Sequence, residues 1–110
     1  MHSDPIFEFM VQKGLSEKLK KKIKGKICFN IIRGSGHKLW LIDSDIKKVI
    51  PDTSQNADTI FNIQDDDMVS FSKGQTNLRT LFMRKKLVIE GDFSNAIRFT
   101  SDLLPKMPLL

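Results

Sequence analysis

The sequence is poor in the side chains that covalent catalysis and metal binding use. Its 110 residues include one cysteine, Cys28, and two histidines, His2 and His37. A catalytic nucleophile needs a base and a group that orients that base. His2 lies at the N-terminus, where disorder is expected, and His37 follows a glycine turn, where a solvated side chain is expected. No cysteine–histidine spacing suits zinc. We therefore expect no enzyme activity, no metal and no cofactor.

A single cysteine also excludes a disulfide framework and favours a cytoplasmic location. The first residues, MHSDPIFEFM, lack the basic stretch and the long apolar run of a signal peptide. No apolar run approaches the roughly 18 residues that cross a membrane. With 40% hydrophobic and 28% charged residues, the chain is expected to form one domain over residues 1–110.

Two short motifs resemble ligand-binding loops only weakly. Gly34-Ser35-Gly36 lacks the longer glycine pattern and the following helix of a phosphate-binding loop. Residues 65–67, all aspartate, lack the alternating ligands and closing glutamate of a calcium loop. Their charges are instead expected to stabilise a helix N-terminus. Cys28 falls in a strand pattern and is expected to be a small core residue.

Basic residues are concentrated near the N-terminus. Residues 16–26, SEKLKKKIKGK, hold six lysines and one glutamate in a chain of net charge +5. Such a cluster suits the phosphates of a nucleic acid or of an anionic membrane, and a solvated helix face is the third interpretation. The cluster lacks arginine, which makes bidentate contacts with phosphate and guanine. We therefore favour transient membrane contact through the Lys18–Lys26 region over nucleic-acid binding.

Hydrophobic spacing predicts alternating helices and strands. Helices are expected from Asp4, which would cap the first of them, to Gly14, and at residues 15–24, 65–73, 76–83 and 92–104. Strands are expected at residues 26–33, 37–44, 46–50, 59–63 and 86–91. Antiparallel hairpins with helices gathered on one side make an α+β domain.

Several pieces of the sequence match one known family in order and spacing. Asn77, Leu81-Phe82 and KLVIEG at 86–91 are similar to the family pattern N-P-x-x-A-F-x-x-G-K-L-x-I-x-G-N. Further matches are Trp40, Ile42 and Asp43, then VIP at 49–51, then Ala57-Asp58. From about residue 6 to residue 104 the chain thus resembles the sterol carrier protein 2 family, the nonspecific lipid-transfer domains.

The sequence departs from the family pattern at a few positions. Leu78 stands where proline is common, Lys85 where glycine usually precedes Lys-Leu, and Asp92 where asparagine is frequent. These changes concern a turn and a loop surface more than the fold. Members often end in a peroxisomal signal of the serine-lysine-leucine kind. Residues 108–110, Pro-Leu-Leu, do not match that signal. The peroxisome thus stays an alternative to the cytoplasm that no C-terminal signal supports.

The resemblance implies a five-stranded, mostly antiparallel sheet covered on one side by helices, with an internal apolar tunnel. The tunnel would bind a fatty acid, fatty acyl-CoA, sterol or phospholipid for intracellular transfer, because burying apolar area returns about 25 cal/mol per Å². An acidic head group would pair with a cation at the tunnel mouth, and Lys18, Lys22 or Arg33 could supply it. Carried over from the family by position and strand alternation, the expected lipid-binding residues are Ile42, Phe61, Ile63, Met68, Phe71, Phe82, Leu87, Ile89, Phe99 and Leu103.

Two alternatives to a free lipid carrier stay open. The lysines of residues 16–26 could serve a basic nucleic-acid-binding module, although the absence of tyrosine and the inward spacing of most phenylalanines argue against base stacking. Family members also occur fused to, or beside, lipid-metabolising enzymes. The chain could therefore be a lipid-presenting accessory domain with an enzyme as its partner.

Overall fold

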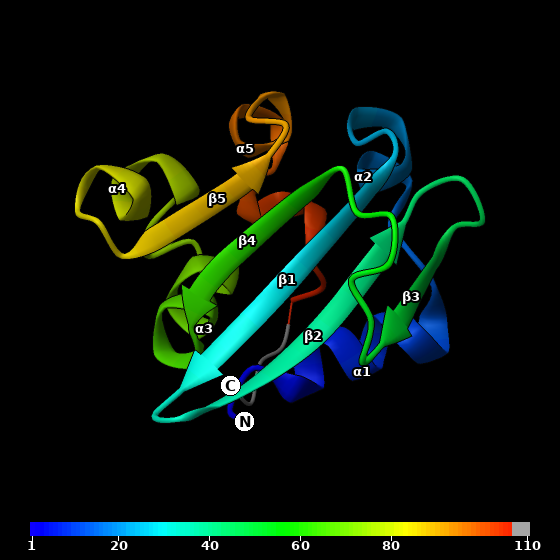
Figure 1. Cartoon of the computed structure of the whole chain (residues 1–110). Helices are drawn as coiled ribbons and strands as arrows, with labels where there is room; N and C mark the ends of the chain where they lie inside the picture. Colours follow the sequence, from blue (N-terminus) through cyan, green and yellow to red (C-terminus); the bar gives the residue numbers. More distant parts are fainter. Residues whose placement is uncertain (107–110) are drawn as a thin grey trace.

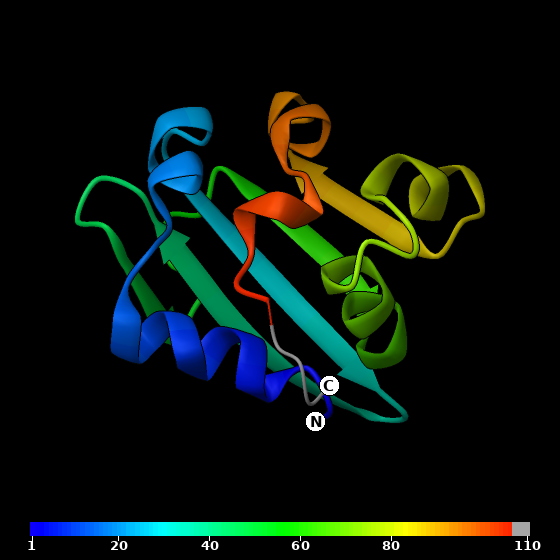
Figure 2. The same ribbon diagram turned by 180° about the vertical axis from the view of Figure 1, so that it is seen from behind.

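The computed structural model describes residues 1–106 and shows a sheet with helices against one face (Figures 1 and 2). The strands are β1 (Lys26–Arg33), β2 (Gly36–Asp43), β3 (Lys48–Pro51), β4 (Thr59–Gln64) and β5 (Leu87–Gly91). Their order in the sheet is β3-β2-β1-β4-β5. The β1–β4 pair is parallel and the other three pairs are antiparallel. The predicted α+β fold with a mostly antiparallel, five-stranded sheet is confirmed.

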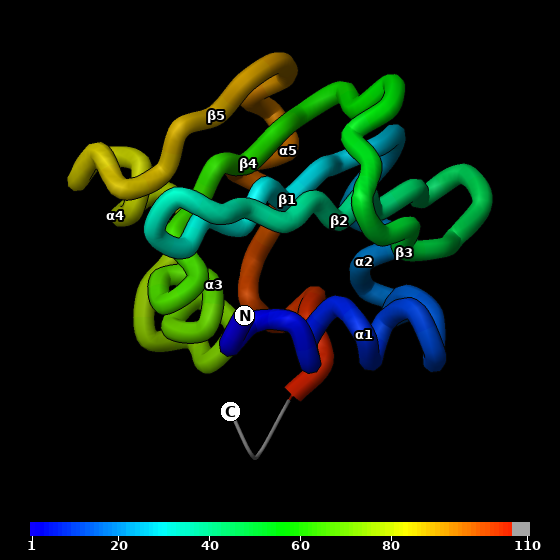
Figure 3. Tube along the Cα trace, turned by 60° about the horizontal axis from the view of Figure 1, so that its bottom comes forward, coloured from blue at the N-terminus to red at the C-terminus, as the bar shows by residue number. Residues whose placement is uncertain are grey.

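The helices fill the other layer of the molecule. They are α1 (Asp4–Lys13), α2 (Glu17–Lys22), α3 (Asp65–Ser72), α4 (Leu78–Met83), α5 (Ser94–Arg98) and a 3-10 turn, η1 (Ser101–Leu103). The segment after α5 crosses this layer, and η1 packs between α2 and α3 (Figure 3). The C-terminal part of the chain thus holds the N-terminal and central helices together.

The core lies between the two layers because side chains alternate along the strands. Phe29 of β1 is paired with Trp40 of β2 and with Phe61 of β4, so the three aromatic rings share the face that the helices cover. Phe7 of α1 stacks on Trp40 with ring centroids 5.1 Å apart. Cys28 points the other way and is fully buried, as expected for a core residue. Its Sγ lies 3.7 Å from the backbone oxygen of Thr53.

Two predictions about the N-terminus are wrong. Asp4 was expected to cap α1, but Ser3 precedes the helix and makes no side-chain cap bond. The Asp4 carboxylate instead binds the N-terminal amine at 3.0 Å, and the Ser3 hydroxyl donates to Asp65. His2 was expected to be disordered, but its backbone N–H also donates to Asp65, at 2.8 Å. A buried carboxylate thus orders residues that local sequence could not place.

The third strand begins and ends later than predicted. Ile46 is 53% exposed and Lys47 has a φ of 60°, so both lie in the turn before the strand. Pro51 was expected to stop the strand, yet it lies within β3 opposite Trp40. An edge strand tolerates proline because one side of it needs no ladder hydrogen bonds.

The last helix is interrupted where a continuous one was predicted over residues 92–104. α5 ends at Arg98, and Phe99 is extended, with φ −85° and ψ 105°. This break turns the Phe99 ring into the core while Ile97 remains 84% exposed. Within the described residues no helix has the length and apolar character needed to cross a membrane. Residues 108–110, compared above with a peroxisomal signal, lie outside the described part of the chain.

Candidate functional site

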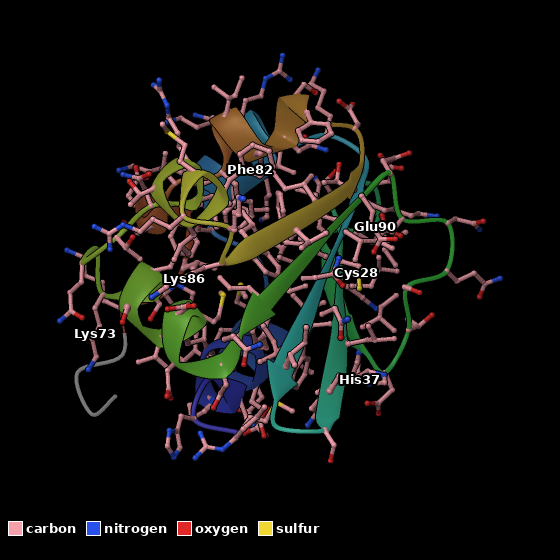
Figure 4. The ribbon with its side chains drawn as sticks, turned by 60° about the vertical axis from the view of Figure 1, so that its left-hand side comes forward. Cys28, His37, Lys73, Phe82, Lys86 and Glu90 are labelled. Atoms are coloured by element: carbon pink, nitrogen blue, oxygen red, sulfur yellow. The ribbon has the colours of Figure 1, made fainter. Side chains whose placement is uncertain are left out.

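A groove of about 590 Å³ opens between α4, β5 and α5. Sites for small molecules typically have volumes of about 300–1,000 Å³. Most of the groove wall is apolar, and Figure 4 shows Phe82 in the space between α4 and α5. The lining residues are Asn77, Leu78, Arg79, Phe82, Ile89, Phe93, Ala96, Ile97, Phe99 and Thr100.

The α4 wall is held by caps at both ends of a short helix. At its start the side-chain oxygen of Asn77 accepts a hydrogen bond from the Thr80 N–H at 2.8 Å. At its end the Lys86 N–H donates to the Leu81 carbonyl, and the Lys85 N–H donates to the Phe82 carbonyl. Lys85 has a φ of 61° there. This is the C-terminal motif in which glycine is usual, and it leads the chain directly from α4 into β5.

The α5 wall is attached to the sheet by a small polar network. Asn95 is buried and its amide donates to the Thr59 hydroxyl at 3.1 Å. That hydroxyl in turn donates to the Asp92 backbone oxygen at 2.7 Å. Gly91 begins the turn with a φ of 85°, and a Cβ there would collide with the Asp58 carbonyl. Bonds from the Ser94 N–H and hydroxyl hold the pKa of Asp92 below its usual value.

Phe99 forms the boundary between the groove and the core. Phe99 is one of the residues that line the groove, although only 2% of it is exposed. The ring lies 5.2 Å from Phe29, 6.4 Å from Phe61 and 6.1 Å from Phe71, measured between ring centroids. The structure shows an open groove at this position, and the tunnel stays a prediction.

The mouth of the groove is apolar and open to solvent. Phe82 is 45% exposed, Phe93 is 53% exposed and Ile97 is 84% exposed. The rings of Phe82 and Phe93 meet edge to face with centroids 5.9 Å apart. Aromatic pairs of this geometry contribute about 0.5–1.5 kcal/mol beyond the area they bury. This pair connects α4 to the turn before α5 across the groove.

Three of the predicted lipid-binding residues line the groove, namely Phe82, Ile89 and Phe99. The other seven belong to the buried core and do not line it: Ile42, Phe61, Ile63, Met68, Phe71, Leu87 and Leu103. Phe61 and Phe71 contact the Phe99 ring from the core side. The predicted contact of all ten residues with a lipid stays a prediction.

The list of ten lipid-binding residues predicted from the sequence omits most of the groove wall. The missed apolar residues are Leu78, Phe93, Ala96 and Ile97, and the missed polar ones are Asn77, Arg79 and Thr100. Phe93 and Ile97 are four residues apart, which indicated a common helix face. The spacing could not show that this face lines a groove and not the core. No sequence pattern singled out Arg79, because hydrophobic spacing does not show which charged residue lies beside a cavity.

The three cations proposed for a head group do not line the groove. Lys18 pairs with Asp102 at 3.5 Å, and Arg33 pairs with Asp65 at 3.1 Å. Lys22 is likewise absent from the groove wall, whereas the cation that does line it is Arg79. An anionic head group in this groove would therefore meet a guanidinium from α4.

One cluster of possible metal ligands lies elsewhere. One ligand atom each from His2, Asp65 and Asp66 lies within 4.8 Å of the others. The Arg33 guanidinium already contacts both carboxylates, at 3.1 Å and 3.7 Å. A bound cation would have to displace this arginine, so the cluster is explained by ion pairing.

Comparisons with known proteins agree on one family. The model of the SCP-2 sterol transfer family matches residues 8–103. Non-specific lipid-transfer protein-like 1 of Caenorhabditis elegans is 30% identical over 109 residues, covering 96% of this chain and 92% of that protein. Sterol carrier protein 2 of Rattus norvegicus is 32% identical over 89 residues. That match covers 77% of this chain but 16% of the rat protein.

Solved structures show the same fold. Sterol carrier protein 2 like 2 from Aedes aegypti has a TM-score of 0.70 at 20% identity, covering 88% of this chain and 92% of that one. Sterol carrier protein 2 from the same mosquito, in complex with palmitate, has a TM-score of 0.67 at 17% identity. The match covers 88% of this chain and 89% of the palmitate-bound one. At these identities the likeness concerns the fold.

Proposed function

The chain belongs to the SCP-2 sterol transfer family, whose members bind and transfer lipids, and we propose that its groove binds the acyl chain of a fatty acid. The observation that carries this proposal is the apolar wall formed by Leu78, Phe82, Ile89, Phe93 and Phe99. Such a wall gains about 25 cal/mol for each Å² of hydrocarbon it covers, before the cost of ordering the chain. The relative from Aedes aegypti in complex with palmitate supports this ligand class.

The polar residues of the groove wall suit an acidic head group. Arg79 and Thr100 line the groove together with the apolar residues. A guanidinium binds a carboxylate or a phosphate through charge-assisted hydrogen bonds, and a hydroxyl adds one more donor. We therefore infer a preference for fatty acids, acyl-CoA or phospholipids over sterols, whose head is an uncharged hydroxyl. Replacing Arg79 by glutamine should weaken fatty-acid binding about tenfold and leave sterol binding unchanged.

The composition of the wall supports a carrier and not an enzyme. The residues that line the groove include one hydroxyl, that of Thr100, and no histidine, cysteine or carboxylate. A hydroxyl nucleophile needs an adjacent base to remove its proton. Within the groove the chemistry on offer is apolar contact, one cation and a few hydrogen bonds. These suffice for reversible binding.

A titration with a fluorescent fatty acid tests the proposal. The purified chain should show saturable binding, and unlabelled palmitate should displace the probe. Phe93→Asp should weaken binding at least about tenfold, because a carboxylate would enter the groove wall. Ile46→Asp is the matched control, since Phe93 and Ile46 are both 53% exposed and only Phe93 lines the groove. Failure of the unmodified chain to bind, or equal weakening by both substitutions, would overturn the proposal.

A second candidate is a lipid-presenting role beside an enzyme. It is favoured by the match to the rat protein, in which the shared stretch is 16% of the whole length. The domain therefore occurs within a longer protein in at least that relative. A pull-down with fatty-acid-loaded chain should then retain a lipid-metabolising enzyme, and retention that does not depend on the loaded lipid would argue against presentation.

A further inference from the structure

The backbone of β5 forms an open edge of the sheet. In the described part of the chain only β4 pairs with this strand. Asp58 and Asp92 continue the register of that pair, and the Asp92 N–H donates to the Asp58 carbonyl at 2.9 Å. Because hydrogen-bonded pairs alternate with non-hydrogen-bonded ones along an antiparallel ladder, every second residue before Asp92 faces β4. The N–H and C=O groups of Leu87 and Ile89 therefore point to the open edge.

The two edges of the sheet differ in how they resist further pairing. At the far edge, β3 contains Pro51, which has no N–H to donate. β5 contains no proline, and its pairs with β4 run from Leu87 to Gly91 without a bulge. Val88 in the middle of this strand is 59% exposed. A sheet edge of this kind can accept an extended segment from another chain.

The exposed side chains along β5 carry opposite charges at a fixed spacing. Alternation places Lys86, which immediately precedes β5, on the same outer face as Val88 and Glu90, and all three are exposed. Among the described residues neither charge takes part in an ion pair, and the Glu90 carboxylate accepts a hydrogen bond from the Asn62 amide at 2.8 Å.

These three side chains would stand closest to those of an added antiparallel strand. Their own backbone groups face β4, so on the open edge they would form the non-hydrogen-bonded pairs, whose Cα atoms lie about 4.5 Å apart. Directly opposed charges stabilise a sheet when their signs differ. The segment that fits would therefore set an acid opposite Lys86, an apolar residue opposite Val88 and a base opposite Glu90.

The helix side of the same edge is apolar. Leu87 is buried, and Ile89 is half-buried and lines the groove. Figures 1 and 2 show α4 and α5 on the outer side of β5, near opposite ends of the strand. Apolar side chains of an added strand would thus lie beside Phe82 and Phe93, which are 45% and 53% exposed.

We propose that the open edge of β5 binds an extended peptide segment of a partner protein, antiparallel to β5. In the order of its own chain, the segment has one basic, three apolar and one acidic residue. Leu87 and Ile89 each offer it one backbone donor and one acceptor. The sequence of β5 has this order itself, but a second copy of the chain is a poorer occupant. Its α4 and α5 would approach the same two helices on the outer side of β5.

Fluorescence anisotropy with labelled peptides tests the edge. The peptide KKLVIEG, which repeats residues 85–91, has the required order, and KELVIKG exchanges one lysine and the glutamate at the same composition. The full chain should bind KKLVIEG saturably and KELVIKG at least about threefold more weakly. Methylation of the leucine backbone nitrogen in KKLVIEG should weaken binding about tenfold, because that N–H faces β5. Methylation of the valine nitrogen, which faces away, should weaken it less than about threefold.

A charge exchange in the protein should reverse the preference. Lys86→Glu combined with Glu90→Lys should bind KELVIKG at least about threefold more tightly than KKLVIEG, and circular dichroism should show an unchanged fold. Neither residue lines the groove. The peptide assay also needs no lipid, so a failure of fatty-acid binding would leave its outcome unaffected. Absence of peptide binding, equal binding of both peptides, or a preference that does not reverse would overturn the proposal. A dimer that KKLVIEG dissociates in sedimentation velocity would instead assign the edge to a second copy.

Discussion

The ring of Phe99 meets the ring of Phe29 edge-on, with centroids 5.2 Å apart, and Phe99 is also one of the residues that line the groove. One residue therefore belongs both to the hydrophobic core and to the candidate binding site. At the mouth of the groove the situation is different, because Phe93 is half exposed and contacts Phe82 alone among the aromatic rings described. Substitutions at the floor and at the mouth should thus affect stability and binding in different proportions.

The first prediction compares these two phenylalanines. Phe99→Ala should lower the free energy of unfolding by about 3–5 kcal/mol, because it leaves a cavity beside Phe29, Phe61 and Phe71. Phe93→Ala should cost about 1 kcal/mol or less, because its ring is already half exposed. Phe93→Ala should nevertheless weaken fatty-acid binding several-fold. Urea unfolding and a fatty-acid titration measure both effects, and similar losses of stability for the two variants would show that Phe99 is not a core residue.

The second prediction concerns the turn between α4 and β5. Lys85 has a φ of 61°, a conformation that costs a residue with a Cβ roughly 1 kcal/mol or more. Glycine removes this cost but makes the unfolded chain more flexible, which offsets about half of the gain. We expect Lys85→Gly to raise the free energy of unfolding by about 0.5 kcal/mol.

The neighbouring residue provides the control for that change. Arg84 precedes Lys85 and has a φ of −85°, so glycine relieves no strain there. Arg84→Gly should lower the free energy of unfolding by about 0.5–1 kcal/mol. The midpoints of urea unfolding should therefore move in opposite directions. A shift in the same direction for both variants would mean that the turn gains nothing from glycine at residue 85.

The third prediction concerns the reactivity of Cys28. Burial raises the pKa of this thiol to about 11, although a hydrogen bond from the Trp40 backbone partly opposes the shift. At pH 8 only about one thiol in a thousand would be ionised. In the folded chain Cys28 is fully buried, so a reagent cannot reach its Sγ. Iodoacetamide should therefore alkylate Cys28 orders of magnitude more slowly in the folded chain than in urea. Mass spectrometry over time measures this, and rapid alkylation under native conditions would show that the segment around Thr53, whose backbone oxygen lies 3.7 Å from the Cys28 Sγ, opens readily.

Local patterns predicted the sheet better than they predicted the groove. Alternation along β4 correctly predicted that Phe61 and Ile63 share a buried face, because a strand has only two faces. Helical spacing is less decisive near the C-terminus. Phe93 and Ile97 share a face, but the break at Phe99 leaves that face exposed. The break depends on contacts of Phe99 with three distant phenylalanines, which no local pattern encodes.

Local sequence patterns did not predict the long-range polar contacts either. The acidic run at residues 65–67 correctly predicted the start of α3. Nothing in it indicated that Asp65 alone would be buried and would accept hydrogen bonds from His2 and Ser3, more than sixty residues earlier. A pattern identifies helix starts, whereas the choice of one carboxylate among three requires the packing of α1 against the sheet.

The last prediction tests that carboxylate. Asp65 accepts hydrogen bonds from the His2 and Ser3 N–H groups and from the Ser3 hydroxyl, and it pairs with Arg33. Asp65→Asn should lower the free energy of unfolding by about 2–3 kcal/mol, because an amide replaces one acceptor oxygen with donors. Asp66→Asn is the matched control: its side chain is 83% exposed, so the change should cost about 0.5 kcal/mol or less.

The lowered pKa of Asp65 determines how the free energy of unfolding should change with pH. Burial alone would raise the pKa of Asp65, but the hydrogen bonds from Ser3, His2 and Arg33 outweigh it and lower the pKa below 3.8. Below pH 3.8 the unfolded chain therefore binds more protons than the folded chain, so stability rises with pH. The contribution of Asp65 is complete well above pH 3.8 and is lost as pH falls through the lower, folded-state value.

Urea unfolding at a series of acidic pH values should show that the free energy of unfolding rises less steeply with pH for Asp65→Asn than for Asp66→Asn. Asp92 and Asp102 also have lowered pKa values and remain in both variants, so only the difference between the two slopes reports on Asp65, and parallel slopes would contradict its role.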